Sequence, residues 1–108
     1  MSMFVLYGIS ALRLELASPL VESALGVVLE SRNSSFSGDY YKSKLQSGES
    51  ISLRYKTIYD RDEVYLAEPE FPGWNVFLYL DHANAVSSIA AKIEQRSDLF
   101  TKLRSKII

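Results

Sequence analysis

Two apolar stretches decide the fold class of this chain: MFVLYGI at residues 3–9 and WNVFLYL at residues 74–80. In both stretches apolar side chains occupy successive positions rather than alternate ones. Successive side chains of a strand point to opposite faces of a sheet, so a stretch that is apolar on both faces is typical of a strand in the middle of a sheet. We therefore expect both segments to be buried central strands.

Shorter segments predict further strands around these two. The alternation LRLEL at residues 12–16 predicts a half-buried strand, although Leu12, Leu16 and Leu20 also have the spacing of helical neighbours. Another strand is expected at residues 27–29. The turn-forming residues 46–49 predict a hairpin that joins a strand near 40–45 to one at 51–59, and a short strand is expected around 64–66.

Helix signals occur at both ends of the chain. Ser18-Pro19 predicts the start of a short helix over residues 20–25, with Gly26 as its left-handed terminator. Near the C-terminus a helical apolar stripe predicts a long amphipathic helix, with a break expected at 96–98. That stripe consists of Val86, Ile89, Ala90, Ile93, Phe100, Leu103 and Ile107.

The order of these elements predicts an α+β fold. We expect residues 1–108 to form a single domain, a two-layer sandwich. Its mainly antiparallel sheet would have about four to six strands, with the helices on one face. The other face of the sheet would be partly open to water.

Composition excludes several classes of protein. The 108 residues contain no cysteine, which rules out disulfides, zinc–thiolate sites, iron–sulfur clusters and a thiol nucleophile, and favours a reducing compartment. The net charge of −1 provides no overall positive field for nucleic acid. No segment approaches the ~18 apolar residues of a membrane span, and the start lacks the basic region of a signal peptide. We expect a cytoplasmic protein without a membrane or nucleic-acid partner.

Catalytic motifs are not recognisable. His82 is the single histidine, and it follows Asp81 at an expected helix start, where a solvated histidine is ordinary. No glycine-flanked serine elbow and no phosphate-binding glycine loop accompanies it. Asp60, Asp62 and Glu63 lie close together but lack the glycine and closing glutamate of a calcium loop. We expect no enzyme, metal or cofactor, and a small enzyme without a known motif is the alternative.

Surface side chains are more informative. Tyr40 and Tyr41 are adjacent in an expected strand, so one of them should face away from the helices, and an exposed tyrosine is typical of a protein-binding surface. Residues 60–70 carry five acidic side chains against Arg61, whereas residues 92–108 are basic. A solvated loop and a solvated helix face would also account for this segregation. The predicted partner-binding residues are Asp39, Tyr40, Tyr41, Asp60, Asp62, Glu68 and Glu70.

Three blocks of sequence carry a family resemblance. They are residues 7–15, the run ESRNSSFSGDYY at 30–41, and EPEFP at 68–72 followed by VFLYL at 76–80. Together these blocks, spread over the first three quarters of the chain, resemble small bacterial immunity proteins of contact-dependent growth inhibition and other polymorphic toxin systems. The resemblance implies a cytoplasmic protein that binds one cognate toxin domain, often a nuclease, and blocks its active site.

The charge pattern agrees with that expectation. A nuclease active site is basic because it holds phosphates, so an acidic and aromatic surface can occupy it. We therefore predict an immunity protein that occludes the active site of a toxin. One rival interpretation is a homo-oligomeric module, such as a homodimer that uses a strand edge or the open sheet face. Another is a nucleic-acid binder that uses the basic C-terminal segment, although no aromatic platform accompanies that segment.

Overall fold

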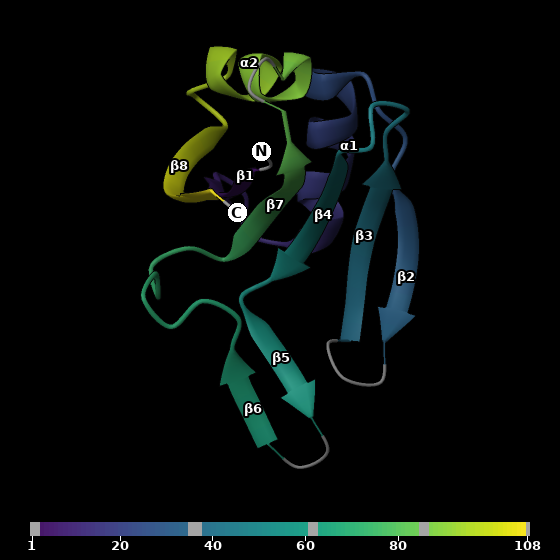
Figure 1. Ribbon diagram of the computed structural model, residues 1–108. Helices are drawn as coiled ribbons and strands as arrows, with labels where there is room; N and C mark the ends of the chain where they lie inside the picture. The colour runs from purple at the N-terminus through teal and green to yellow at the C-terminus, as the bar shows by residue number, and fades with distance from the viewer. Residues whose placement is uncertain (1–2, 35–37, 61–62, 85–86, 108) are drawn as a thin grey trace.

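The computed structural model describes residues 3–34, 38–60, 63–84 and 87–107, and of Ser34, Gly38, Tyr59 and Asp60 only the backbone. Strands and helices follow one another along the chain as shown in Figure 1. They are β1 (Met3–Ile9), α1 (Leu14–Leu25), β2 (Glu30–Ser34), β3 (Gly38–Lys44), β4 (Ser50–Tyr55), β5 (Thr57–Asp60), β6 (Glu63–Leu66), β7 (Val76–Ala83), α2 (Ser88–Gln95) and β8 (Phe100–Ile107).

Six of the described strands form one antiparallel sheet in the order β2-β3-β4-β7-β1-β8. The two apolar stretches that predicted central strands are β1 and β7, and each has a partner strand on both sides. Tyr7 of β1, for example, pairs with Leu78 on one side and with Lys102 on the other. The predicted central position of both segments is confirmed. The remaining two strands, β5 and β6, form a separate hairpin.

Both helices contribute to one core on a single face of this sheet. In α1 the buried apolar positions recur at helical spacing, namely Leu14, Ala17, Val21 and Leu25. They pack with alternate residues of β1, β4 and β7 and with Ile93 of α2. Removing a leucine or isoleucine side chain from water stabilises the fold by about 1.5–3 kcal/mol, so this cluster is the main source of stability. No helix in the described part of the chain is long and apolar enough to cross a membrane.

The predicted long C-terminal helix is wrong. Only Ser88–Gln95 is helical, and Phe100–Ile107 forms β8, which pairs with β1 from Ile9↔Phe100 to Met3↔Ile107. A strand that is apolar on both faces needs a neighbour on each side, and β8 supplies the second neighbour of β1. A few apolar residues at helical spacing could not outweigh that pairing. Val86, at the start of the predicted stripe, lies outside the described residues.

The N-terminal elements also differ from expectation. Residues 12–16 are not a strand, and α1 starts at Leu14, so it includes Pro19 and is longer than the predicted helix. Leu12 precedes the helix, and Leu12, Leu16 and Leu20 are all exposed. Gly26 ends the helix in the left-handed conformation, as predicted, with φ of 66°. Residues 27–29 are a connection rather than a strand.

The middle of the chain follows the prediction more closely. The hairpin turn at 46–49 is confirmed, and Leu45 N–H donates to the Glu49 carbonyl across it at 2.8 Å. The strand predicted at 51–59 is divided at Lys56 into β4 and β5. Asp81 and His82 do not start a helix, because both still belong to β7.

Ser87 caps α2 through a partly buried hydrogen-bonded network. Its Oγ accepts from Ala90 N–H at 3.1 Å and donates to Glu49 Oε2 at 2.5 Å, and the other carboxylate oxygen of Glu49 accepts from Ser47 Oγ at 2.9 Å. Glu49 is buried, so these hydroxyl donors replace its lost water. The network ties the β3–β4 turn to the start of α2.

Replacing Ser87 by alanine is expected to lower the free energy of unfolding by about 2 kcal/mol. The loss combines a helix cap with a hydrogen bond to a buried carboxylate. Urea unfolding measures the effect, and Ser88→Ala is the matched control because Ser88 is exposed in the first turn. Equal stability of the two variants would contradict the role of the network.

Candidate protein-binding site

The β5–β6 hairpin extends beyond the main sheet from the end of β4 (Figure 1), and we call residues 57–66 the arm. Its register runs from Thr57↔Leu66 to Asp60↔Glu63. Lys56 holds the base of the arm: its N–H donates to the Asn75 carbonyl, and its carbonyl accepts from Ala67 N–H, both at 2.8 Å. An isolated two-stranded hairpin is marginal in water, so this anchoring fixes where the arm leaves the sheet.

The arm presents apolar side chains to solvent on both of its faces. Val64 is 58% exposed, Tyr65 48% and Leu66 44%. Because successive strand residues alternate, Val64 and Leu66 share one face and Tyr65 lies on the other. The Tyr65 hydroxyl donates to the carboxylate of Glu63. Single exposed apolar residues are ordinary, but three in succession on a projecting hairpin are typical of a protein contact.

The loop at residues 67–75 returns across the sheet face opposite the helices. Glu68 lies near its start, where it accepts from the Tyr79 hydroxyl at 3.0 Å and from Arg104 Nη2 at 2.5 Å. Its side chain is only 12% exposed. Burial, and then the nearby Glu68 carboxylate, raise the pKa of Tyr79 well above its usual value. Glu68, predicted as a partner-binding residue, therefore also joins the loop to β7 and β8.

Trp74 closes the same loop against the sheet. Its ring lies directly over Gly8 of β1, so close that a Cβ on Gly8 would be 2.4 Å from Trp74 Cδ2. Leu6 and Phe77 are buried on this side of the sheet although they are not part of the core beneath the helices. The face that was expected to be partly open is thus covered over part of its area by its own loop.

The structure separates the predicted residues of the middle segment. Tyr41 packs against the core, whereas Tyr40 lies on the other face of the sheet, 4.4 Å from the guanidinium carbon of Arg54 above its ring. The predicted alternation of the two tyrosines is confirmed. Asp39 is exposed and accepts from Asn33 Nδ2 at 2.7 Å. Tyr40 pairs in register with Arg54, near the end of β4 from which the arm continues.

The predicted acidic residues have different environments. Glu70 is 72% exposed, with a carboxylate oxygen 3.9 Å from Arg104 Nη1. Asp60 ends β5, but its side chain lies outside the description, as does the whole of Asp62. Sequence reasoning did not select Val64, Tyr65 and Leu66. One feature of the sequence could have selected these three residues. They form a short apolar run that follows an acidic segment, and the run has too few residues to be a central strand.

The possible catalytic residues do not form a reactive group. His82 has a positive φ of 58° and is exposed, and its ring meets the edge of Phe4 with centroids 5.1 Å apart. Burial raises the pKa of Asp81, while His82, Lys42 and Arg54 act in the opposite direction. Among the described residues no three histidine or acidic side chains gather as metal ligands.

Comparisons with known proteins do not indicate a function, so the function has to be inferred from the geometry of the chain. No protein-family model, curated protein or solved structure gives a significant match. We base the candidate site on the arm, which projects from the sheet with apolar side chains on both faces.

Proposed function

We propose that this chain is a cytoplasmic immunity protein that binds a bacterial toxin domain, of the nuclease type, and occludes its active site. The arm is the observation that supports the proposal. It combines three exposed apolar side chains with a narrow, projecting shape that fits a concave site. The resemblance of the sequence to immunity proteins of toxin systems supplies the class of partner.

The charges near the arm are those required by a basic cleft. In the sequence, Asp60, Asp62 and Glu63 are acidic residues of the arm segment and Glu70 follows that segment, with Arg61 as the single cation among them. Apolar contacts surrounded by charged ones are the usual anatomy of a protein interface. Rim charges mainly raise the association rate and select the partner, whereas buried apolar anchors provide most of the affinity.

The base of the arm favours tight binding because it is already fixed. Lys56 bonds to both Asn75 and Ala67, and the loop after the arm is joined to the sheet through Glu68. Ordering a flexible segment costs free energy on binding, so an arm whose root is fixed loses less of its interaction energy. A stable interface needs about 800 Å² on each partner, and the exposed residues Asp39 and Glu70 can extend the contact beyond the arm.

Replacing Val64 and Leu66 together by serine is expected to weaken toxin binding about 30-fold. Serine removes apolar surface from one face of the arm without changing its charge, and two buried apolar contacts account for about 2 kcal/mol. Titration calorimetry with the C-terminal toxin domain encoded immediately upstream measures the affinity. The matched control is Leu16→Ser with Leu20→Ser, which removes a pair of similarly exposed leucines, 55% and 46%, from α1.

Two results would contradict this assignment. One is equal toxin affinity for the arm variant and the α1 variant, since the arm would then lie outside the interface. The other concerns self-association in sedimentation velocity. A wild-type dimer that the arm variant converts to a monomer would show that the arm binds a second copy of the chain, which is the homo-oligomeric alternative.

A further inference from the structure

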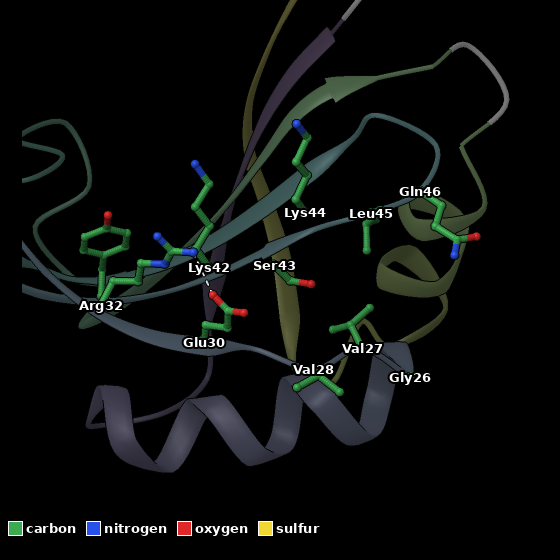
Figure 2. Close-up of a pocket in the computed structure, with 11 residues that line it drawn as sticks. Gly26, Val27, Val28, Glu30, Arg32, Lys42, Ser43, Lys44, Leu45 and Gln46 are labelled. Atoms are coloured by element: carbon green, nitrogen blue, oxygen red, sulfur yellow. Dashed lines mark hydrogen bonds and ion pairs between the residues drawn. The ribbon is translucent and has the colours of Figure 1, made fainter.

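A hollow of about 580 Å³ lies at the β2 edge of the sheet, away from the arm (Figure 2). Its lining comes from β2, β3 and the connection between α1 and β2. The residues that give it its chemical character are Glu30, Arg32, Tyr40, Lys42 and Lys44. We define this group as the basic hollow.

The basic hollow exists because β2 begins late. The first residue of β2, Glu30, pairs with Lys42, so Lys44 extends past the start of β2. The preceding chain turns toward α1 instead, and Glu22 fixes that turn by accepting from Leu29 N–H at 2.9 Å. The edge of β3 is therefore left beside an open space that Val27 and Val28 border from below (Figure 2).

Positive charge gathers on one side of this space. Lys42 and Lys44 point to the same side of β3, away from α1, and Arg32 rises beside them (Figure 2). Alternate residues of a strand are about 7 Å apart, so the two ammonium groups can contact different phosphates. Arg32 is paired with Glu30 at 2.7 Å, and both side chains are exposed. Neither Lys42 nor Lys44 forms an ion pair within the described part of the chain.

An aromatic ring adjoins these cations. Tyr40 is in register with Arg32 on one side and with Arg54 on the other, and Arg54 stacks on its ring. Proteins that bind single-stranded nucleic acids combine lysines with the flat groups of arginine and tyrosine. The cations contact the phosphates, and the flat groups stack on the bases. The sequence argued against nucleic acid because the net charge is −1 and no aromatic stacking platform accompanies the basic C-terminal segment. The fold instead assembles a basic and aromatic surface from three neighbouring strands.

The acidic residues nearby do not cancel this charge. Glu30 offsets Arg32, which leaves Lys42, Lys44 and Arg54 on this part of the sheet. Asp81 is on the same face, two strands away from Lys44 across Ser50, and its carboxylate offsets part of the charge of Lys42 and Arg54. We propose that the basic hollow binds phosphate groups of a nucleotide or a single-stranded nucleic acid. This is a second site, and it does not depend on the proposed toxin-binding function.

The test uses the full chain and a fluorescein-labelled oligo-uridine in an anisotropy titration, with ATP as a second probe. The variant Lys42→Ala with Lys44→Ala is expected to weaken oligonucleotide binding about 10-fold or more. Each lost phosphate contact lowers the slope of log affinity against log salt by about 0.7, so the slope should fall by about 1.4. Lys92→Ala with Lys102→Ala is the control, because it makes the same change in net charge at side chains beside α2.

Each outcome decides the proposal. Loss of binding in the Lys42/Lys44 variant and not in the control supports it. In that case, if the Lys42/Lys44 variant also loses ATP binding, phosphate groups alone are recognised. If the wild-type chain binds the oligonucleotide and not ATP, a polymer is required. If neither probe binds the wild-type chain at protein concentrations up to about 0.1 mM, the proposal is overturned. An equal loss in the two double variants would also overturn it, because it would show non-specific attraction. Toxin affinity of the Lys42/Lys44 variant separates this result from the function of the arm.

Discussion

Replacing Gly8 by alanine is expected to destabilise the protein by about 3 kcal/mol. The added Cβ would be 2.4–2.8 Å from three atoms of the Trp74 indole, closer than carbon atoms approach each other in proteins. An indole has no free end that can move aside, so Trp74 must shift as a unit and move the loop at 67–75 with it. Overpacking of this kind typically costs 1–3 kcal/mol, and here the strand that would have to shift is central to the sheet.

Two further variants isolate the cause. Gly73→Ala is the matched control, because a Cβ there has no atom within 4 Å, and its effect on urea unfolding should be within about 0.5 kcal/mol. In a Trp74→Ala background the Gly8→Ala change should cost less than about 1 kcal/mol, because the clashing ring is absent. An unchanged cost in that background would show that Trp74 is not the obstacle. Because the loop joins the arm to β7, Gly8→Ala should also weaken the toxin binding that we propose.

Raising the pH from 10 to 12 is expected to remove about 2 kcal/mol of stability through Tyr7. Burial, with a smaller contribution from the charge of Glu94, raises the pKa of Tyr7 to about 12. A tyrosine in the unfolded chain ionises near pH 10. The contribution of neutral Tyr7 to the stability of the folded state is therefore fully present below pH 10. It is lost as the pH rises through the folded-state pKa, because the unfolded chain releases the tyrosine proton at a lower pH. Tyr79, whose pKa is also raised, adds to the loss in the same direction.

Tyr7→Phe provides the test of this assignment. No described residue hydrogen bonds with the buried Tyr7 hydroxyl, so removing that hydroxyl should leave stability at pH 7 unchanged or slightly higher. Between pH 10 and 12 the variant should lose about 2 kcal/mol less than the wild-type chain in urea unfolding at each pH. The same alkaline loss in both proteins would exclude Tyr7 as its source.

Local sequence patterns identified most of the strands and the turn between β3 and β4. They succeeded where a pattern is typical of a single type of secondary structure, as in the two segments with apolar side chains on both faces that form β1 and β7. They failed at both ends of the chain, where helical and strand spacing coincide over a few residues. Leu12, Leu16 and Leu20 have the right spacing for a helix face, but the neighbouring set that begins at Leu14 is the buried one.

The candidate site was predicted only in part. The adjacent tyrosines could be assigned to opposite faces because a strand alternates, and Tyr41 is indeed in the core while Tyr40 is not. The acidic loop could not be divided in the same way. No local pattern in the sequence distinguishes Glu68 from Glu70. In the structure β8 brings Arg104 beside both carboxylates, and the Glu68 side chain is mostly buried whereas that of Glu70 is exposed.

The sequence by itself determined that β1 and β7 would be central strands and that an antiparallel sheet would pack against helices. Apolar side chains on both faces of a segment require burial on both faces, wherever the rest of the chain goes. Tertiary structure alone decided that the last residues form a strand beside β1, that Trp74 covers Gly8, and that Arg32 and Arg54 flank Tyr40. These contacts join residues that are far apart in the sequence or come from different strands, so their energies depend on pairing and packing that no local pattern contains.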